Sequence, residues 1–202
     1  MSRGTHPTPT IATTSTAPEW SRPLRVIHLL LAIAVTAQLF IGSLMRSPHP
    51  GRPDSLGFIS HEVIGGCILV LIVLHWAWSV MHPNEGILHL FPWNPAGMRR
   101  VAGQLRQAVL EQHLPSGGPA DPGLAGFVHG LGLLAISAMV VIGGTFFVTR
   151  AASASPATLG LIKDIHDVGA VVVWIYWGGH LFAAIVHGLL GQPVMRVFRL
   201  RA

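Results

Sequence analysis

Histidines recur at a fixed interval inside the most apolar parts of this sequence. His166 and His180 lie 14 residues apart in one apolar run, and His61 and His75 repeat that interval in another. An α-helix rises about 1.5 Å and turns about 100° per residue, so each pair occupies one helix face at two levels about 21 Å apart. Because ligands this far apart cannot share one ion, the spacing argues against a single zinc or iron site built from one helix.

Two large cofactors stacked along the helix axis fit this spacing. Haem iron takes axial imidazoles, and two imidazoles from facing helices hold a b-type haem without a covalent link. The single cysteine, Cys67, offers no CxxCH attachment site, disulfide framework or cysteine metal cluster. Gly65 follows His61 and Gly169 follows His166, where a missing Cβ allows backbone to approach a porphyrin, although helix packing alone explains many such glycines.

The composition points to a membrane protein. Of the 202 residues, 50% are hydrophobic and only 10% are charged. A bilayer core needs about 20 residues of apolar helix, and the runs that reach this length are residues 25–44, 56–80, 124–148 and 162–190. We therefore expect an all-α fold, a bundle of four transmembrane helices within residues 20–202. Residues 1–19 are rich in Thr, Pro and Ser and lack the apolar centre of a secretory signal, which predicts a disordered cytoplasmic tail.

Positively charged residues indicate the direction of the helices. The larger group flanks the N-terminal tail, the second connection and the C-terminus: Arg3, Arg22, Arg25, Arg99, Arg100, Arg106, Arg196, Arg199 and Arg201. The smaller group is Arg46, Arg52, Arg150 and Lys163. Because cytoplasmic loops carry an excess of Lys and Arg, both termini are expected in the cytoplasm. The net charge of +5 is then explained by arginines that orient the helices in the membrane, and we expect no nucleic-acid partner.

The second connection contains a segment with helical periodicity. Within residues 94–113, apolar side chains recur every three or four positions beside Arg99, Arg100 and Arg106. This pattern predicts an amphipathic helix on the cytoplasmic face of the membrane, with a solvated linker helix as the alternative.

With these features, the chain resembles the bacterial cytochrome b561 family and the related cytochrome b subunits of nickel-iron hydrogenases and formate dehydrogenases. The resemblance covers nearly all of residues 20–200. It rests on RPLRVIHLLLAIAV, SHEVIGG, GLAGFVHGLG and IKDIHDVGA…GGHLFAAIVHGLLG, and PWNPAGMRR is similar to the loop before the third helix of the hydrogenase type.

The resemblance implies two haem b groups and a set of four ligands. In that family pattern His61 and His166 hold the haem nearer the outside, and His28 and His180 hold the haem nearer the cytoplasm. The spacing alone would instead pair His75 with His180. The family often has an arginine where His75 stands, so we interpret His75 as lining the inner haem through a propionate or a water.

Four further residues are candidates for contacts around the haems. His187 lies seven residues beyond His180, and with His129 it is a candidate partner for a haem propionate or a quinone head group. Solvation near lipid headgroups is the equally weighted alternative for His187. Arg25 and Lys163 lie near helix ends on the inner and outer haem sides. They are candidates to neutralise propionates, or else they are membrane anchors whose charged ends reach the interface.

The resemblance implies electron transfer across a bacterial inner membrane. Ligation by two histidines leaves no open iron position, so we expect no catalytic side chains and no O₂ binding at iron. The expected partners are the lipid bilayer, quinone or quinol, and an unidentified redox protein or small reductant such as periplasmic superoxide. The chain would act alone or as a homodimer, and the sequence leaves open whether it is a quinone-linked oxidoreductase.

Two other functions remain as alternatives. The first is a haem-b subunit that anchors a larger dehydrogenase or hydrogenase. The second is a histidine-lined transporter of metal ions or protons. A transporter would need acidic groups near the histidines in mid-membrane, whereas Glu62, Asp164 and Asp167 cluster at the predicted outer ends of the helices.

Overall fold

The structure, a computed structural model, describes residues 20–49, 52–110 and 123–190. The tail predicted for residues 1–19 and the last part of the predicted 94–113 segment lie outside these ranges. Most of the described residues are helical, and none of them forms a strand. The helices are α1 (Arg22–Leu44), α2 (Leu56–Met81), α3 (Ile87–Leu90), α4 (Pro95–Leu110), α5 (Leu124–Ala151) and α6 (Pro156–Leu189).

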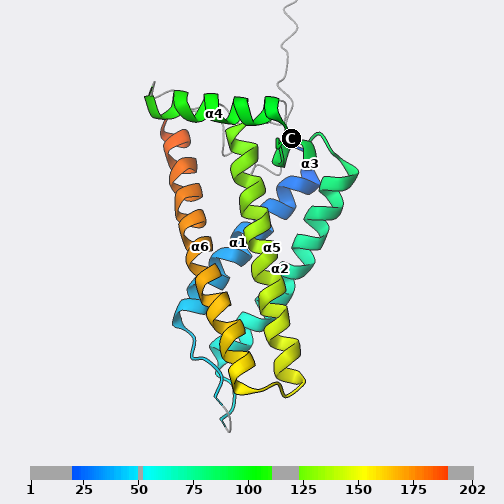
Figure 1. The fold of residues 1–202 in the computed structure, drawn as a ribbon, viewed down its shortest axis with the longest axis vertical. Helices are drawn as coiled ribbons and strands as arrows, with labels where there is room; N and C mark the ends of the chain where they lie inside the picture. The colour runs from blue at the N-terminus through cyan, green and yellow to red at the C-terminus, as the bar shows by residue number, and fades with distance from the viewer. Residues whose placement is uncertain (1–19, 50–51, 111–122, 191–202) are drawn as a thin grey trace, which may run out of the picture.

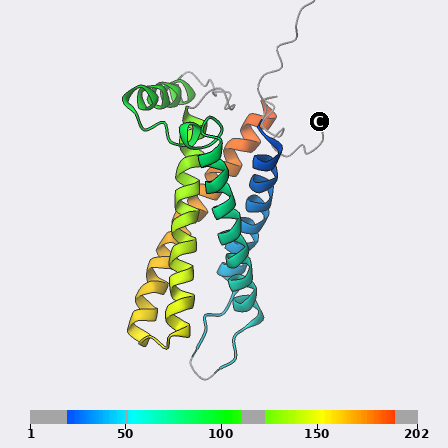
Figure 2. The same cartoon turned by 90° about the vertical axis from the view of Figure 1, so that its right-hand side faces the viewer.

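Four of these helices are long and apolar enough to cross a membrane. They are α1, α2, α5 and α6, each with a mean hydropathy of at least 1.7 over its most apolar stretch. They run lengthwise side by side, and α4 lies across one end of the bundle (Figures 1 and 2). We call this the α4 end, and the opposite end, with the connections after α1 and α5, the short-loop end. The chain is therefore a multi-pass, all-α membrane protein.

The structure departs most from the predicted helices at the start of α6 and at α3. α6 begins at Pro156 rather than near residue 162, because Ser155 accepts a 3.2 Å hydrogen bond from the Thr158 amide and Pro156 stands at the first helical position. α3 was not predicted at all. It is a single short turn that carries the buried side chains of His89 and Leu90.

The bundle is built from two helical hairpins. α1 packs closely along α2, and α5 packs closely along α6, while α2 and α5 join the two hairpins. Two tryptophans bond across the hairpins: Trp76 Nε1 donates to Ser137 Oγ at 3.0 Å, and Trp177 Nε1 donates to Thr36 Oγ1 at 3.0 Å. Such bonds satisfy polar groups that a bilayer cannot solvate. The backbones of α1 and α6 approach each other much less closely, and so do those of α2 and α6.

α4 is attached to the bundle through its contact with α5. Val101 is buried, and Gln104 Oε1 accepts a 2.7 Å hydrogen bond from the backbone amide of Leu124, in the first turn of α5. The amide groups of a first helical turn lack partners inside their own helix, so this side chain caps α5 from α4.

Candidate functional site

At the short-loop end, His61 of α2 faces His166 of α6. Their ring centroids lie 6.1 Å apart and the ring planes are inclined by 78°. The Nδ1 atoms of both rings are buried and have no hydrogen-bond partner among the residues that the structure describes. A buried ring nitrogen without a partner is unfavourable unless it serves another purpose. We call His61 and His166 the outer pair.

Each ring of the outer pair packs beside a glycine of the other helix in its hairpin. A Cβ added to Gly42 of α1 would approach His61 Cε1 to 3.0 Å and Nδ1 to 3.3 Å. A Cβ added to Gly143 of α5 would lie 3.5 Å from His166 Cε1 and 3.9 Å from Nδ1. The Nδ1 edges therefore face neighbouring helices, which leaves Nε2 of each ring as the nitrogen available to a cofactor.

At the α4 end, three imidazoles converge from three helices. His28 of α1 lies 6.3 Å from His180 of α6 and 6.1 Å from His129 of α5, measured between ring centroids, and His129 lies 4.9 Å from His180. One ring nitrogen from each lies within 4.8 Å of the other two. We call His28, His129 and His180 the inner cluster. The structure thus brings the predicted pair together and adds a third imidazole.

Neighbouring residues fix the rings of the inner cluster. His129 Nδ1 lies 2.7 Å from the Ala125 backbone oxygen, so Nδ1 carries the proton and Nε2 is left as the free nitrogen. The Tyr176 ring stacks on His180 at 5.6 Å and 13°. Tyr176 fits against α5 because Gly132 has no Cβ, which would overlap the phenol ring. The sequence predicts His129 only as a candidate partner for a haem propionate or a quinone head group. No pattern in the sequence places it beside His28 and His180.

His75 lies beside the inner cluster and contacts a residue of its own helix. Its Nδ1 lies 3.2 Å from the hydroxyl of Ser79, a fully buried residue one helical turn later. His75 is close enough to interact electrostatically with His28 and His129. The ring nitrogens that converge, however, are those of the inner cluster.

The remaining predicted residues lie around these two sites. Gly65 makes room for Gln38, whose Nε2 would lie 3.3 Å from an added Cβ, and Gly169 makes room for the sulfur of Met139. Arg25 is buried in the first turn of α1 at the α4 end. His187 lies in the last turn of α6. Lys163 is an exposed side chain that forms an ion pair of 2.5 Å with Asp167.

Both sites fit a haem held by two imidazoles. A metal–imidazole bond is about 2 Å long, so a metal between two imidazoles separates their ring centroids by about 6 Å. The outer pair shows 6.1 Å, and His28 and His180 show 6.3 Å. Each pair also bridges two helices whose backbones do not pack closely against each other. This arrangement suits a broad, flat group inserted between the hairpins.

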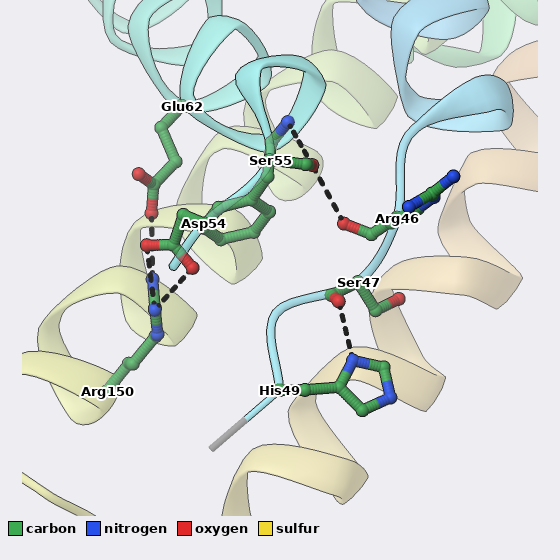
Figure 3. Close-up of polar contacts among 8 residues, drawn as sticks. Arg46, Ser47, His49, Asp54, Ser55, Glu62 and Arg150 are labelled. Atoms are coloured by element: carbon green, nitrogen blue, oxygen red, sulfur yellow. Dashed lines mark hydrogen bonds and ion pairs between the residues drawn. The ribbon is translucent and has the colours of Figure 1, made fainter. Parts of the chain in front are cut away.

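Charged side chains gather outside the outer pair, at the short-loop end. Arg150 Nη2 binds both carboxylate oxygens of Asp54 at 2.8 and 2.9 Å, and Arg150 Nη1 lies 3.8 Å from Glu62 (Figure 3). The guanidinium also lies over the Phe58 ring at 5.1 Å. A cavity of about 400 Å³ adjoins this cluster, lined in part by Phe147. Glu62 thus pairs with Arg150 at the short-loop end, whereas a histidine-lined transporter would need acidic groups near the histidines in mid-membrane.

The chain is similar to a known protein family. A family model described as prokaryotic cytochrome b561 matches residues 19–198, most of the chain. No curated protein and no solved structure matches it. The match spans all four long helices and both histidine sites.

Proposed function

Because the chain belongs to the prokaryotic cytochrome b561 family, in which haem b carries electrons across a membrane, we propose that it connects the quinone pool to a redox partner through two haems. His61 and His166 bind the outer haem, and His28 and His180 bind the inner haem. When bound, haem supplies reversible one-electron chemistry. Two imidazoles at each haem would leave no open iron position, which would favour electron transfer over O₂ binding.

The main support for this proposal is that α6 contributes one imidazole to each site. His166 faces His61, and His180 faces His28, at ring separations of 6.1 and 6.3 Å. The 14 residues between them correspond to about 21 Å along the helix. Two haems held at these levels divide a bilayer core of about 30 Å into shorter steps.

The α4 end faces the cytoplasm in this proposal. α4 carries exposed apolar side chains at Met98, Leu105 and Val109, and Arg99 and Arg106 follow Met98 and Leu105 directly in the sequence. A helix with this pattern rests in the headgroup layer with its apolar stripe towards the acyl chains. The arginines then meet the anionic surface of the cytoplasmic leaflet of the bacterial inner membrane.

In the direction that we propose, electrons enter at the short-loop end and are passed to quinone. A small periplasmic reductant such as superoxide would donate near the outer pair. The quinone head group would be held near the inner cluster, where His187, in the last turn of α6, and His129 are the candidate hydrogen-bond partners. His75 and Arg25 would contact the propionates or water around the inner haem, and Lys163 would do so at the outer haem. The chain acts alone or as a homodimer.

Reconstitution into vesicles tests this function. The purified protein is placed in liposomes that contain quinone, superoxide is generated outside, and haem reduction and quinol formation are followed by absorbance. We expect superoxide to reduce both haems and to produce quinol in the wild type. The His166→Ala variant should not produce quinol, because the outer haem is missing.

A different result would point to the subunit alternative. If superoxide and quinol fail to reduce the haems of a fully loaded protein, the proposed partners are wrong. Co-purification of a dehydrogenase or hydrogenase catalytic subunit from the native membrane would then identify the chain as its membrane anchor.

A further inference from the structure

α1 contacts the outer pair, although His61 comes from α2 and His166 comes from α6. Gln38 Nε2 donates a 3.0 Å hydrogen bond to the backbone oxygen of His61. Gly42, one turn later on the same face of α1, lies against the His61 ring, where an added Cβ would come within 3.0 Å of Cε1. Two positions of α1 therefore touch the backbone and the imidazole of one residue.

The Gln38 bond is not needed to satisfy the His61 carbonyl. Residue 61 lies inside α2, where a carbonyl normally accepts from the amide four residues later. The side chain of Gln38 thus adds a second donor at this carbonyl. Its own Oε1 atom is buried and has no partner among the described residues. A half-satisfied amide inside a membrane helix is unfavourable, and polar groups kept there are usually functional.

α2 is shaped to receive this side chain. Gly65 lies one turn after His61, and a Cβ there would lie 3.3 Å from Gln38 Nε2, which is tighter than an ordinary contact. The two helices are therefore complementary at this level: Gly65 leaves room for the amide of Gln38, and Gly42 leaves room for the imidazole of His61. A change on either side moves the ring or the backbone that carries it.

We propose that Gln38 and Gly42 are positioning residues that set the orientation of the His61 imidazole at the outer haem. This inference rests on the proposed function, since it takes His61 as a haem ligand. Groups that orient a ligand tune the metal that the ligand binds. α1 supplies His28 to the inner cluster and also holds His61, so it influences both haems.

The test uses Gly42→Ala and Gln38→Met in the purified, haem-loaded protein. The alanine crowds the ring, and the methionine keeps the side-chain length but removes the amide. We expect both haems to remain, and we expect the low-spin electron paramagnetic resonance signal and the midpoint potential of the outer haem to shift. The corresponding values of the inner haem should stay unchanged. The shift should be larger for Gly42→Ala.

Two other glycines provide matched controls. A Cβ added to Gly143 would meet His166 only at an ordinary 3.5 Å, and a Cβ added to Gly66 would meet nothing within 4 Å. The outer-haem shift should decrease from Gly42→Ala through Gly143→Ala to none in Gly66→Ala.

Distinct results separate failure of this inference from failure of the proposed function. Wild-type spectra and potentials in both Gly42→Ala and Gln38→Met, or equal shifts of both haems, would overturn the positioning role while leaving two bound haems in place. If Gly42→Ala does not fold, Gln38→Met alone decides. A wild-type protein without b-type haem would instead contradict the proposed function.

Discussion

The outer pair and the inner cluster are built differently although α6 contributes to both. The outer pair has two imidazoles, each packed beside a glycine, and the residues described around it offer no third imidazole. The inner cluster has three converging imidazoles, with Tyr176 stacked on one of them and His75 nearby. The outer site therefore offers only the two imidazoles of His61 and His166 among the described residues, whereas the inner site offers a third imidazole that could replace a lost one.

Because the two sites are built differently, the two proposed haems should respond unequally to the same kind of substitution. In the proposed assignment, loss of one residue of the outer pair would leave a single imidazole at that site, with no other described imidazole to replace it. Loss of His28 leaves His129 and His180, whose ring centroids lie 4.9 Å apart. The surroundings of the two sites also differ, and axial geometry, hydrogen bonding and burial set haem potentials. We therefore expect two separable potentials.

The largest effect is expected from His166→Ala. The variant should lose the outer haem completely and keep the inner one, because only one imidazole remains at the outer site. The ratio of haem to protein in the purified variant measures this, and the value should fall to half of the wild-type value. Retention of both haems would show that His166 is not a ligand.

A smaller effect is expected from His28→Ala. This variant should retain part of its inner haem with an altered spectrum, because His129 presents a free Nε2 to the same space. The double variant His28→Ala/His129→Ala should lose that remainder. The haem ratio and the visible spectrum of each variant decide the point. If the single and double variants hold equal amounts of haem, His129 provides no reserve.

His75→Ala should have a smaller effect again. The Nδ1 atom of His75 contacts Ser79, and the converging ring nitrogens belong to the inner cluster, so both haems should remain bound, with at most a shift in the inner-haem potential. The haem ratio and a redox titration are the measurements. Loss of the inner haem in His75→Ala, together with its retention in His28→Ala, would reverse our assignment of this ligand.

The smallest effect concerns the charged cluster at the short-loop end. Arg150→Gln removes a two-oxygen contact to Asp54 between partly exposed side chains, and it should lower the free energy of unfolding by about 1 kcal/mol. Lys163→Gln removes a more exposed pair and serves as the control, with a smaller loss. Thermal unfolding followed by tryptophan fluorescence measures both. Equal unfolding midpoints in the Arg150→Gln variant and the wild type would show that Arg150 adds nothing to stability.

The sequence predicted the four long helices because apolar runs of sufficient length are a strong signal. It did not predict the start of α6, since the Ser155 cap and Pro156 stand in a stretch that otherwise resembles a loop. The 14-residue interval indicated two levels of ligands, but it could not select partners on other helices. The placement of His129 and Gly42 depends on how the hairpins pack, and a single sequence does not specify that packing.

The proposed electron transfer requires that one chain holds two b-type haems. A reduced-minus-oxidised absorption spectrum of the purified membrane protein, combined with a haem count per chain, tests it most directly. We predict a b-type spectrum and two haems per chain. Absence of that spectrum, or a count well below two in intact protein, would contradict it.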